Sequence, residues 1–175
     1  MKFRPTVHYS LRGLVVFEVH LRTARMDVHS GVHGGVSPNA VRELTALVSR
    51  LHDAQGRVAV PGFYDRVRPM EAWEEEALRA LPFDEAEYAG WMGAAMHGEA
   101  GFSTNERRWF RPTLECNGIL GGYTGEGSKT IVPCSAMAKF SARLVADQEP
   151  DEVMAGLRAW FADEAPPWVH LDFIP

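Results

Sequence analysis

Residues 12–22 read RGLVVFEVHLR, and the alternation within this stretch decides what kind of fold the chain can form. One set of alternate positions is apolar throughout: Val15, Phe17, Val19 and Leu21. The intervening set is mixed: Val16, Glu18, His20 and Arg22. A period of two with β-branched residues predicts a strand that is buried on one face only. Such a strand belongs to a sheet that is covered on one side.

Two amphipathic helices are predicted to supply the covering layer. The first lies within residues 37–56, SPNAVRELTALVSRLHDAQG, whose apolar residues form one stripe: Val41, Leu44, Leu47, Val48 and Leu51. Ser37 is expected to cap its start, with Pro38 in the first helical position and Gly56 at its end. The second helix begins at Pro150 and carries a similar stripe: Val153, Leu157, Trp160 and Phe161.

Three further strands are predicted, at residues 113–119, 131–145 and 168–174. The middle strand alternates an apolar set with a polar set: Phe140, Ala142 and Leu144 against Lys139, Ser141 and Arg143. A glycine-rich loop, residues 121–130, precedes it. The order β-α-β-β-α-β is the ferredoxin-like pattern. We therefore expect an α+β fold with a four-stranded antiparallel sheet and two long helices on one face.

Residues 57–111 are expected to form a helical insertion in the same domain, because their apolar residues are too few for a second core. An acidic helix is predicted near residues 70–81, with three side chains turned inward: Trp73, Ala77 and Leu81. Its glutamates, at 74–76, are expected to be solvated. Asp84 followed by Glu87 predicts a capping box for another short helix. The last part of the insertion is expected to be irregular.

The size and composition of the chain suit one domain, spanning residues 1–175. The net charge of −5 argues against nonspecific nucleic-acid binding, which needs a basic surface. No apolar run approaches the roughly 20 residues of a membrane-spanning helix, and the opening MKFRPTVHYS has no signal-peptide character. Cys116 and Cys134 form neither a zinc-type spacing nor a disulfide framework. We therefore expect a cytoplasmic protein that binds neither nucleic acid nor membrane.

Residues 27–35, DVHSGVHGG, raise the question of a metal site. His29 and His33 are four residues apart, but the glycines among them disfavour the helix that would bring both to one face. Asp27 is close in sequence, yet a zinc site needs at least three protein ligands, and the other histidines are scattered. We expect no self-contained metal site, and two polar loop histidines remain the alternative.

The stretch GYTGEGSKT, residues 122–130, is close to the phosphate-binding motif G-x-x-x-x-G-K-[ST], but a serine separates its last glycine from the lysine. The motif also needs a following helix, whereas Pro133 and the alternation after it predict an extended segment. Serine catalysis is disfavoured as well, because Ser30 and Ser128 lie outside any G-x-S-x-G turn. Neither nucleotide binding nor a serine triad is expected.

Three ordered motifs carry a family resemblance: residues 27–35, residues 117–133 (NGILGGYTGEGSKTIVP) and residues 139–145 (KFSARLV). Together they resemble the lid, or dimerisation, domain of the di-zinc metallopeptidase superfamily. That superfamily includes carnosine and other dipeptidases, aminoacylases, acetylornithine and succinyl-diaminopimelate deacylases, and glutamate carboxypeptidases. The dipeptidase branch is most similar. The resemblance implies a homodimer that forms through the lid sheet, and a small peptide or N-acyl amino acid as substrate.

The resemblance also implies a catalytic domain whose H-x-D motif and paired glutamates bind two zinc ions, or manganese in their place. We find no H-x-D motif here and no glutamate pair in matching context, so we expect a lid without its catalytic domain, inactive in hydrolysis by itself. The complete enzyme would be a metal-dependent dipeptidase or amidohydrolase. Two alternatives stay open: a stand-alone ferredoxin-like module for ligand binding or regulation, and a purely structural dimerisation unit.

Three residues match positions to which the resemblance assigns a function. His29 is implied to reach the active site of the other subunit and to stabilise the oxyanion there. Thr130 is implied to contact the substrate, and Arg143 to bind its terminal carboxylate through the guanidinium fork. Without the resemblance, a surface salt bridge would explain Arg143 equally well. His33 has no implied role, and nearby glycines are expected to shape the loops that aim His29 and Thr130.

Overall fold

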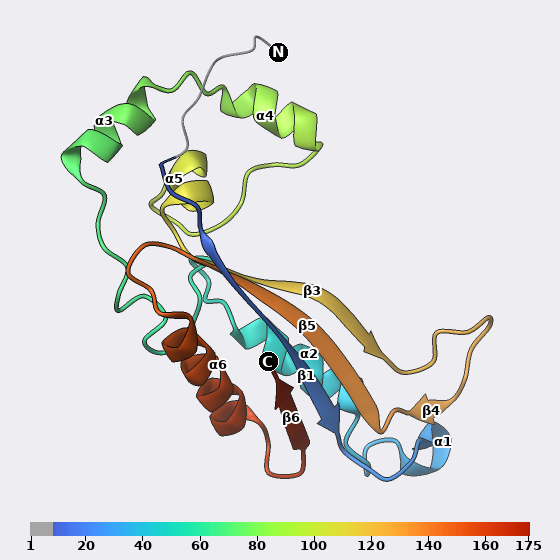
Figure 1. Cartoon of the computed structure of the whole chain (residues 1–175). Helices are drawn as coiled ribbons and strands as arrows, with labels where there is room; N and C mark the ends of the chain where they lie inside the picture. The colour runs from blue at the N-terminus through green and yellow to red at the C-terminus, as the bar shows by residue number, and fades with distance from the viewer. Residues whose placement is uncertain (1–8) are drawn as a thin grey trace.

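The computed structural model describes residues 9–175, and its centre is a four-stranded antiparallel sheet (Figure 1). The strands, in the order β3-β5-β1-β6, are β3 (Thr113–Gly121), β5 (Ser135–Leu144), β1 (Gly13–Arg22) and β6 (His170–Ile174). Neighbouring strands run antiparallel throughout. This arrangement confirms the predicted ferredoxin-like fold. Residues 1–8, on which the expectation about a signal peptide mainly rests, lie outside the described residues.

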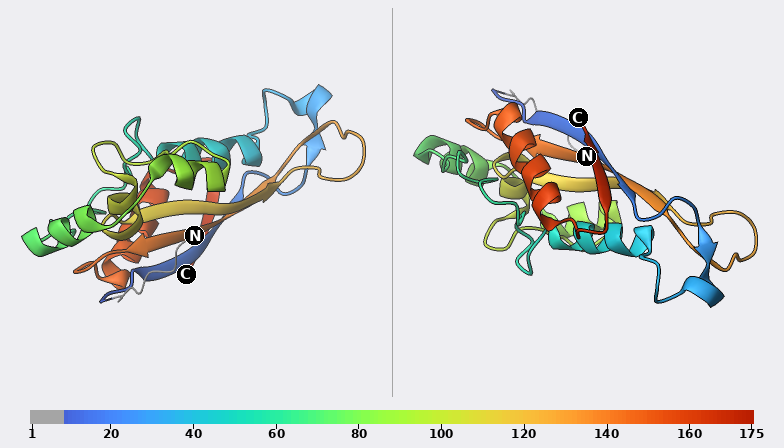
Figure 2. Two further views of the ribbon diagram at one scale, coloured as in Figure 1. Left: turned by 90° about the horizontal axis from the view of Figure 1, so that it is seen from above. Right: turned by 90° about the horizontal axis from the view of Figure 1, so that it is seen from below.

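Two long helices, α2 (Ala40–Arg50) and α6 (Pro150–Glu164), lie on the same side of the sheet (Figure 2). The alternate apolar residues of β1 face them and are at most 9% exposed. Phe17 is the centre of this core, with its ring 4.9 Å from that of Phe140 and 4.6 Å from that of Phe173. Each such buried side chain contributes about 2–3 kcal/mol. No helix within residues 9–175 has both the length and the apolarity to cross a membrane.

The predicted start and end of α2 are wrong by a few residues. Asn39 is the N-cap instead of Ser37, because its side-chain oxygen accepts hydrogen bonds from the N–H groups of Val41 and Arg42. The helix ends at Arg50 and not at Gly56. Gly56 serves a later turn with a φ of 71°, where a Cβ would lie 2.8 Å from the carbonyl oxygen of Gly98.

The segment predicted as one strand over residues 131–145 is interrupted at Pro133 and Cys134. Before the break lies β4 (Ile131–Val132), which pairs with β2 (Val28–His29) in a separate two-stranded sheet. The expectation that no helix forms near His29 is also wrong, because α1 (Ser30–His33) is a single helical turn. A single turn can form despite the glycines, because it requires only one backbone hydrogen bond. Here the N–H of Gly34 donates to the carbonyl of Ser30 at 2.8 Å.

The insertion, residues 57–111, contains three short helices: α3 (Ala72–Ala80), α4 (Glu85–Met92) and α5 (Thr104–Trp109). Only half of the capping box predicted for α4 is found among the described residues: the Asp84 side chain accepts from the N–H of Glu87, without a return bond to the Glu87 side chain. The helix α5 was not expected. It begins at Ser103, whose side chain and that of Glu106 form a capping box.

The orientation predicted for α3 is wrong. The three residues expected to turn inward, Trp73, Ala77 and Leu81, are exposed, and Glu74 is the residue that is buried. The Glu74 carboxylate accepts from both terminal nitrogens of Arg68, from the hydroxyl of Tyr9 and from the N–H of Glu71. These four hydrogen bonds, two of them from the charged Arg68, offset the cost of desolvating the carboxylate. A glutamate can therefore occupy the buried position of α3 where an apolar side chain was expected.

Candidate functional site

Two predicted site residues, His29 and Thr130, come together at one end of the sheet, where β2 pairs with β4 (Figure 1). They are 101 residues apart in sequence, and the Nε2 atom of His29 lies 3.0 Å from the hydroxyl oxygen of Thr130. The N–H of Ser30 also donates to the carbonyl of Thr130 at 2.9 Å. Both side chains are exposed. The pair therefore forms a polar site open to solvent.

The contacts of His29 define which ring nitrogen carries the proton. The N–H of Gly31 donates to Nδ1 at 3.0 Å, so that Nδ1 is an acceptor without a proton. In the neutral ring the proton then lies on Nε2. Nε2–H faces the hydroxyl of Thr130, which accepts from it in this geometry. The result is an outward N–H donor held in place by the first residues of α1.

Asp27 positions the two strands that carry the site. Its carboxylate accepts from the backbone N–H of Cys134 at 2.9 Å, which ties the start of β2 to the break between β4 and β5. The pKa of Asp27 lies below its ordinary value, first because of this backbone hydrogen bond and then through the Cys134 side chain and the charge of Lys129. The sequence suggested Asp27 only as a metal ligand, and this positioning role was not predicted. The one available indication was that Asp27 lies at the start of the motif that contains His29.

Close approaches at two glycines define the loops around the pair. A Cβ at Gly31 would lie 2.9 Å from Cε1 of His29, so any larger residue would push the imidazole aside. A Cβ at Gly125 would lie 2.6 Å from the hydroxyl of Tyr123. That hydroxyl donates to the carbonyl of Glu126, and Lys129 lies over the ring of Tyr123 at 5.4 Å. The 121–130 loop is thus organised by its own aromatic residue.

Arg143, the third predicted site residue, does not join the other two. It lies near the end of β5, opposite Leu14 of β1 and Thr113 of β3, and its side chain is exposed on the face without helices. Eight residues separate it from Ser135, where β5 begins next to the His29 site, and at about 3.3 Å per residue this is roughly 26 Å. One chain therefore presents its candidate residues at the two opposite ends of one sheet.

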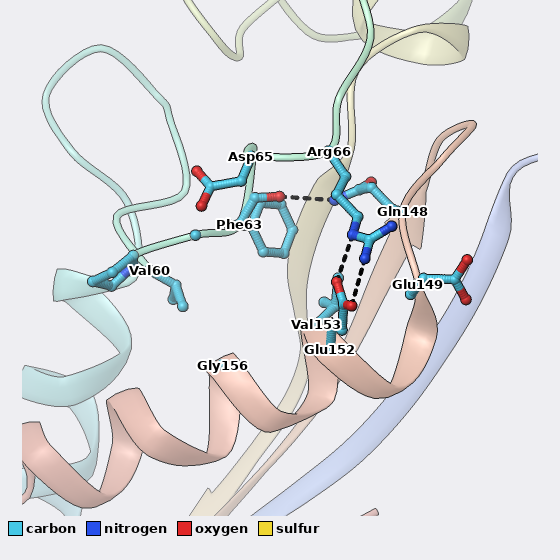
Figure 3. Close-up of a pocket in the computed structure, with 11 residues that line it drawn as sticks. Val60, Phe63, Asp65, Arg66, Gln148, Glu149, Glu152, Val153 and Gly156 are labelled. Atoms are coloured by element: carbon cyan, nitrogen blue, oxygen red, sulfur yellow. Dashed lines mark hydrogen bonds and ion pairs between the residues drawn. The ribbon is translucent and has the colours of Figure 1, made fainter.

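Two hollows accompany these features. A groove of about 510 Å³ adjoins the His29 site and is lined by residues such as Arg22, Asp27, Leu120, Met137 and Asp172. A cavity of about 330 Å³ lies between residues 60–66 and the start of α6 (Figure 3). There Arg66 pairs with Glu152 at 2.6 Å and Gln148 donates to the carbonyl of Phe63 at 2.8 Å. These polar groups form hydrogen bonds with each other across the cavity. The contacts therefore connect the insertion to the start of α6.

The described residues do not fit a metal ion. Within residues 9–175, no three His, Cys, Asp or Glu side chains converge on one point. An H-x-D sequence does occur, at residues 170–172, but it lies on β6, where His170 and Asp172 pair with each other at 3.3 Å and are exposed. Both ring nitrogens of His29 already have partners in Gly31 and Thr130.

Comparison with known proteins gives a consistent match. The family model of the peptidase dimerisation domain matches residues 9–169. The chain is 34% identical to human Beta-Ala-His dipeptidase over 146 residues, which cover 81% of this chain and 28% of the relative. It is 31% identical to a Cys-Gly metallodipeptidase of Candida albicans, covering 83% of this chain and 30% of that protein.

Solved structures agree with the sequence relatives. An M20 family metallo-carboxypeptidase from Sulfolobus solfataricus superposes with a TM-score of 0.78 at 31% identity, covering 92% of this chain and 37% of that one. Human carnosine dipeptidase 1 gives a TM-score of 0.78 at 29% identity, covering 93% of this chain and 36% of that one. The chain thus spans about a third of the length of the relatives that it matches.

Proposed function

The chain belongs to the family of peptidase dimerisation domains, and from that membership we propose that it is the dimerisation and substrate-binding lid of a metal-dependent dipeptidase-like hydrolase. Relatives named as dipeptidases and a metallodipeptidase support this proposal. The observation that carries it is the His29–Thr130 pair, an exposed donor with a fixed tautomer.

We assign His29 the stabilisation of the oxyanion. When the carbonyl of a peptide or N-acyl amino acid becomes tetrahedral, its oxygen gains negative charge. Nε2–H of His29 would donate to this oxygen in place of the Thr130 hydroxyl, which then turns to another substrate atom. A preorganised donor of this kind contributes about 3–4 kcal/mol to the transition state.

Arg143 would bind the terminal carboxylate of the substrate, and the sheet geometry implies that it does so in another active site. A dipeptide spans at most about 7 Å, whereas roughly 26 Å of β5 separates Arg143 from the His29 end. One substrate cannot contact both ends of one lid. We therefore propose a homodimer in which His29 and Thr130 of one copy and Arg143 of the other serve the same substrate.

The metal ions would be held by a catalytic domain, with two zinc ions as the proposed set. No cluster in residues 9–175 suits them, and the relatives are about three times as long as this chain. The chain alone should therefore hydrolyse no dipeptide. The same observation favours one rival, a ligand-binding module without catalysis. The open reading frame separates the two, since the hydrolase requires paired glutamate ligands encoded with this domain and the module does not.

The direct test is His29→Ala in the enzyme that contains this domain, with His33→Ala as the matched control. His33 lies on the same helical turn and is exposed. We expect His29→Ala to lower kcat by roughly 10²- to 10³-fold with little change in KM. His33→Ala should keep kcat within about twofold. Equal losses in the two variants, or none in either, would contradict the proposal.

A further inference from the structure

We propose that Arg12 and Arg108 join Arg143 in one anion site, and that this site selects substrates whose C-terminal residue carries a second carboxylate. The inference rests on the proposed carboxylate-binding role of Arg143 and extends it to the substrate class. Register brings Arg12 and Arg143 together, because Arg143 pairs with Leu14, and Arg12 lies two residues before Leu14 on the same face. The helix α5, which carries Arg108, lies at this end of the sheet (Figure 1).

Neutral groups fix the two additional guanidinium groups. Arg12 donates to the backbone carbonyl of Arg111 at 3.4 Å. Arg108 donates to the side-chain oxygen of Asn105 at 3.1 Å, and its guanidinium lies 4.9 Å from the rings of both Tyr88 and Trp109. Such contacts orient a guanidinium and leave its charge without a counter-ion. Both side chains are half-buried, so their positions are constrained.

The arginines of this site have no carboxylate partner, as is true of eight of the fourteen arginines in residues 9–175. Six arginines in residues 9–175 pair with a glutamate: Arg42, Arg50, Arg57, Arg66, Arg68 and Arg111. For Arg12, Arg108 and Arg143 the described residues offer no carboxylate within 4.0 Å. Glu115 is the nearest acid on this face by register, two residue pairs along the strands from Arg143, and it does not reach the guanidinium. The net charge of −5 makes this grouping of cations more unusual.

The charges of Arg143 and Arg108 act on Arg12. The pKa of Arg12 lies below its ordinary value, first because the side chain is partly desolvated and then because Arg143 and Arg108 repel its charge. Like charges held together without a counter-ion raise the energy of the free protein, and an anion relieves this repulsion when it binds. A single carboxylate neutralises one of three positive charges, and a dicarboxylate neutralises two. The exposed side chain of Leu14 beside Arg143 offers apolar contact for the methylenes between the two carboxylates.

The experiment is a titration of the full 175-residue chain with N-acetylglutamate and N-acetylglutamine, followed on the arginine side-chain NMR resonances at low salt. The two ligands match in length and differ by one charge. We expect N-acetylglutamate to bind about fivefold more tightly, the ratio for one further exposed charge pair. Arg12→Gln and Arg108→Gln should each reduce that ratio below about twofold, Arg12→Lys should preserve it, and Arg143→Gln should weaken both ligands. Arg79 is an exposed arginine on α3, and Arg79→Gln should change the affinity for neither ligand.

The outcomes separate this inference from the proposal on which it rests. If Arg143→Gln weakens both ligands but the wild-type chain binds them equally, the role of Arg143 stands and the selection for a second carboxylate is overturned. If Arg12→Gln and Arg108→Gln weaken N-acetylglutamate while Arg143→Gln does not, the anion site stands and the role of Arg143 fails. Inorganic phosphate is the third ligand. Tighter binding of phosphate than of N-acetylglutamate would assign the site to a free phosphate instead and overturn the substrate assignment.

Discussion

The side chain of His29 is held by few contacts, and under the proposed function these contacts serve to orient it. Its ring lies in solvent, so its contacts with Gly31 and Thr130 add little to stability. What they provide is orientation, because Nδ1 is held as an acceptor and Nε2–H points away from α1. The Thr130 hydroxyl is a neutral acceptor at 3.0 Å from Nε2, and under the proposed function a substrate oxygen would replace it there. A developing oxyanion competes well with such a hydroxyl, since charged acceptors form stronger hydrogen bonds.

Gly31→Ala tests whether the orientation of His29 matters more than its presence. The added Cβ would lie 2.9 Å from Cε1 of His29, so the imidazole must move while the backbone of α1 keeps its conformation. We expect kcat of the enzyme containing this domain to fall by roughly 10- to 100-fold, because small displacements of a catalytic group are costly. Stability should not fall, since alanine suits a helical turn better than glycine.

Gly90→Ala is the control, because a Cβ at Gly90 meets nothing within 4 Å. It should leave kcat unchanged and raise stability slightly. The ring of His29 can be followed in the isolated chain by its nitrogen NMR shifts, which report the Nε2–H tautomer. If Gly31→Ala leaves both these shifts and kcat at wild-type values, the role given to Gly31 is wrong.

The site could be predicted from sequence only in part, because it depends on contacts between single residues that are distant in sequence. The motifs identified His29 and Thr130 as candidates, but their meeting depends on two strands of two residues each. Strands of that length have no periodicity to detect. The proton position on His29 depends on a backbone N–H two residues later, and the role of Asp27 depends on Cys134 in a distant segment.

At the scale of elements, the insertion differs from the sheet in what holds it together. The strands and long helices are held by apolar stripes, whereas α3 is anchored by the buried carboxylate of Glu74 and its partner Arg68. The hydrogen bonds from Arg68 and other donors lower the pKa of Glu74 to about 2. A second buried ion pair, between Glu99 and Arg111, holds the other end of the insertion. Polar anchoring makes this part of the fold sensitive to acid.

Acid should therefore loosen α3 before it unfolds the sheet. The folded-state pKa of Glu74 lies below its ordinary value of 4.5, so its contribution is complete above about pH 4.5 and is lost as the pH falls toward 2. Hydrogen exchange between pH 6 and pH 2.5 should show earlier loss of protection in residues 72–80 than in β1 and β5. Simultaneous loss in α3 and in the sheet would contradict this order.

Glu74→Ala separates the ion pair from the general effect of acid. Removing one partner of a buried pair leaves Arg68 uncompensated, and we expect the opening free energy of α3 to fall by about 3 kcal/mol at pH 7. Glu75→Ala, at the exposed neighbouring position, should change it by less than about 0.5 kcal/mol. Exchange protection of the α3 amides measures both variants, and similar values in the two would show that the ion pair is not the anchor.

These polar anchors explain which elements the sequence predicts well. Hydrophobic periodicity locates β1, β5, α2 and α6, because their burial is apolar and regular. It assigned α3 the wrong buried face, because a paired glutamate occupies the position that an apolar residue would otherwise take. The start of α2 is a matter of capping and not of periodicity: Ser37 and Asn39 are equally good caps in sequence, and only the structure selects Asn39.

At the scale of the whole molecule, the long strand β5 connects the two candidate sites without letting them act together. The His29 site lies beyond its beginning, and Arg143 with its neighbouring cations lies near its end. Roughly 26 Å of extended backbone cannot bend to bring these residues to one substrate. In the proposed homodimer, a second copy of the domain would bring Arg143 to the substrate that His29 contacts. Sedimentation of the chain at tens of micromolar should accordingly give the mass of a dimer, and a monomer mass would count against the arrangement.

Mixing two inactive variants gives the sharpest test of that arrangement. In the complete enzyme, His29→Ala and Arg143→Gln should each abolish most activity as homodimers. In a mixed dimer, one active site receives both substitutions and the other receives neither, if each site takes His29 from one copy and Arg143 from the other. Random reassociation makes about half of the dimers mixed, and each has one intact site of two, so about a quarter of the wild-type kcat should return. If both residues served the same site from one copy, every site in the mixture would carry one substitution, and activity would stay at the level of the variants alone.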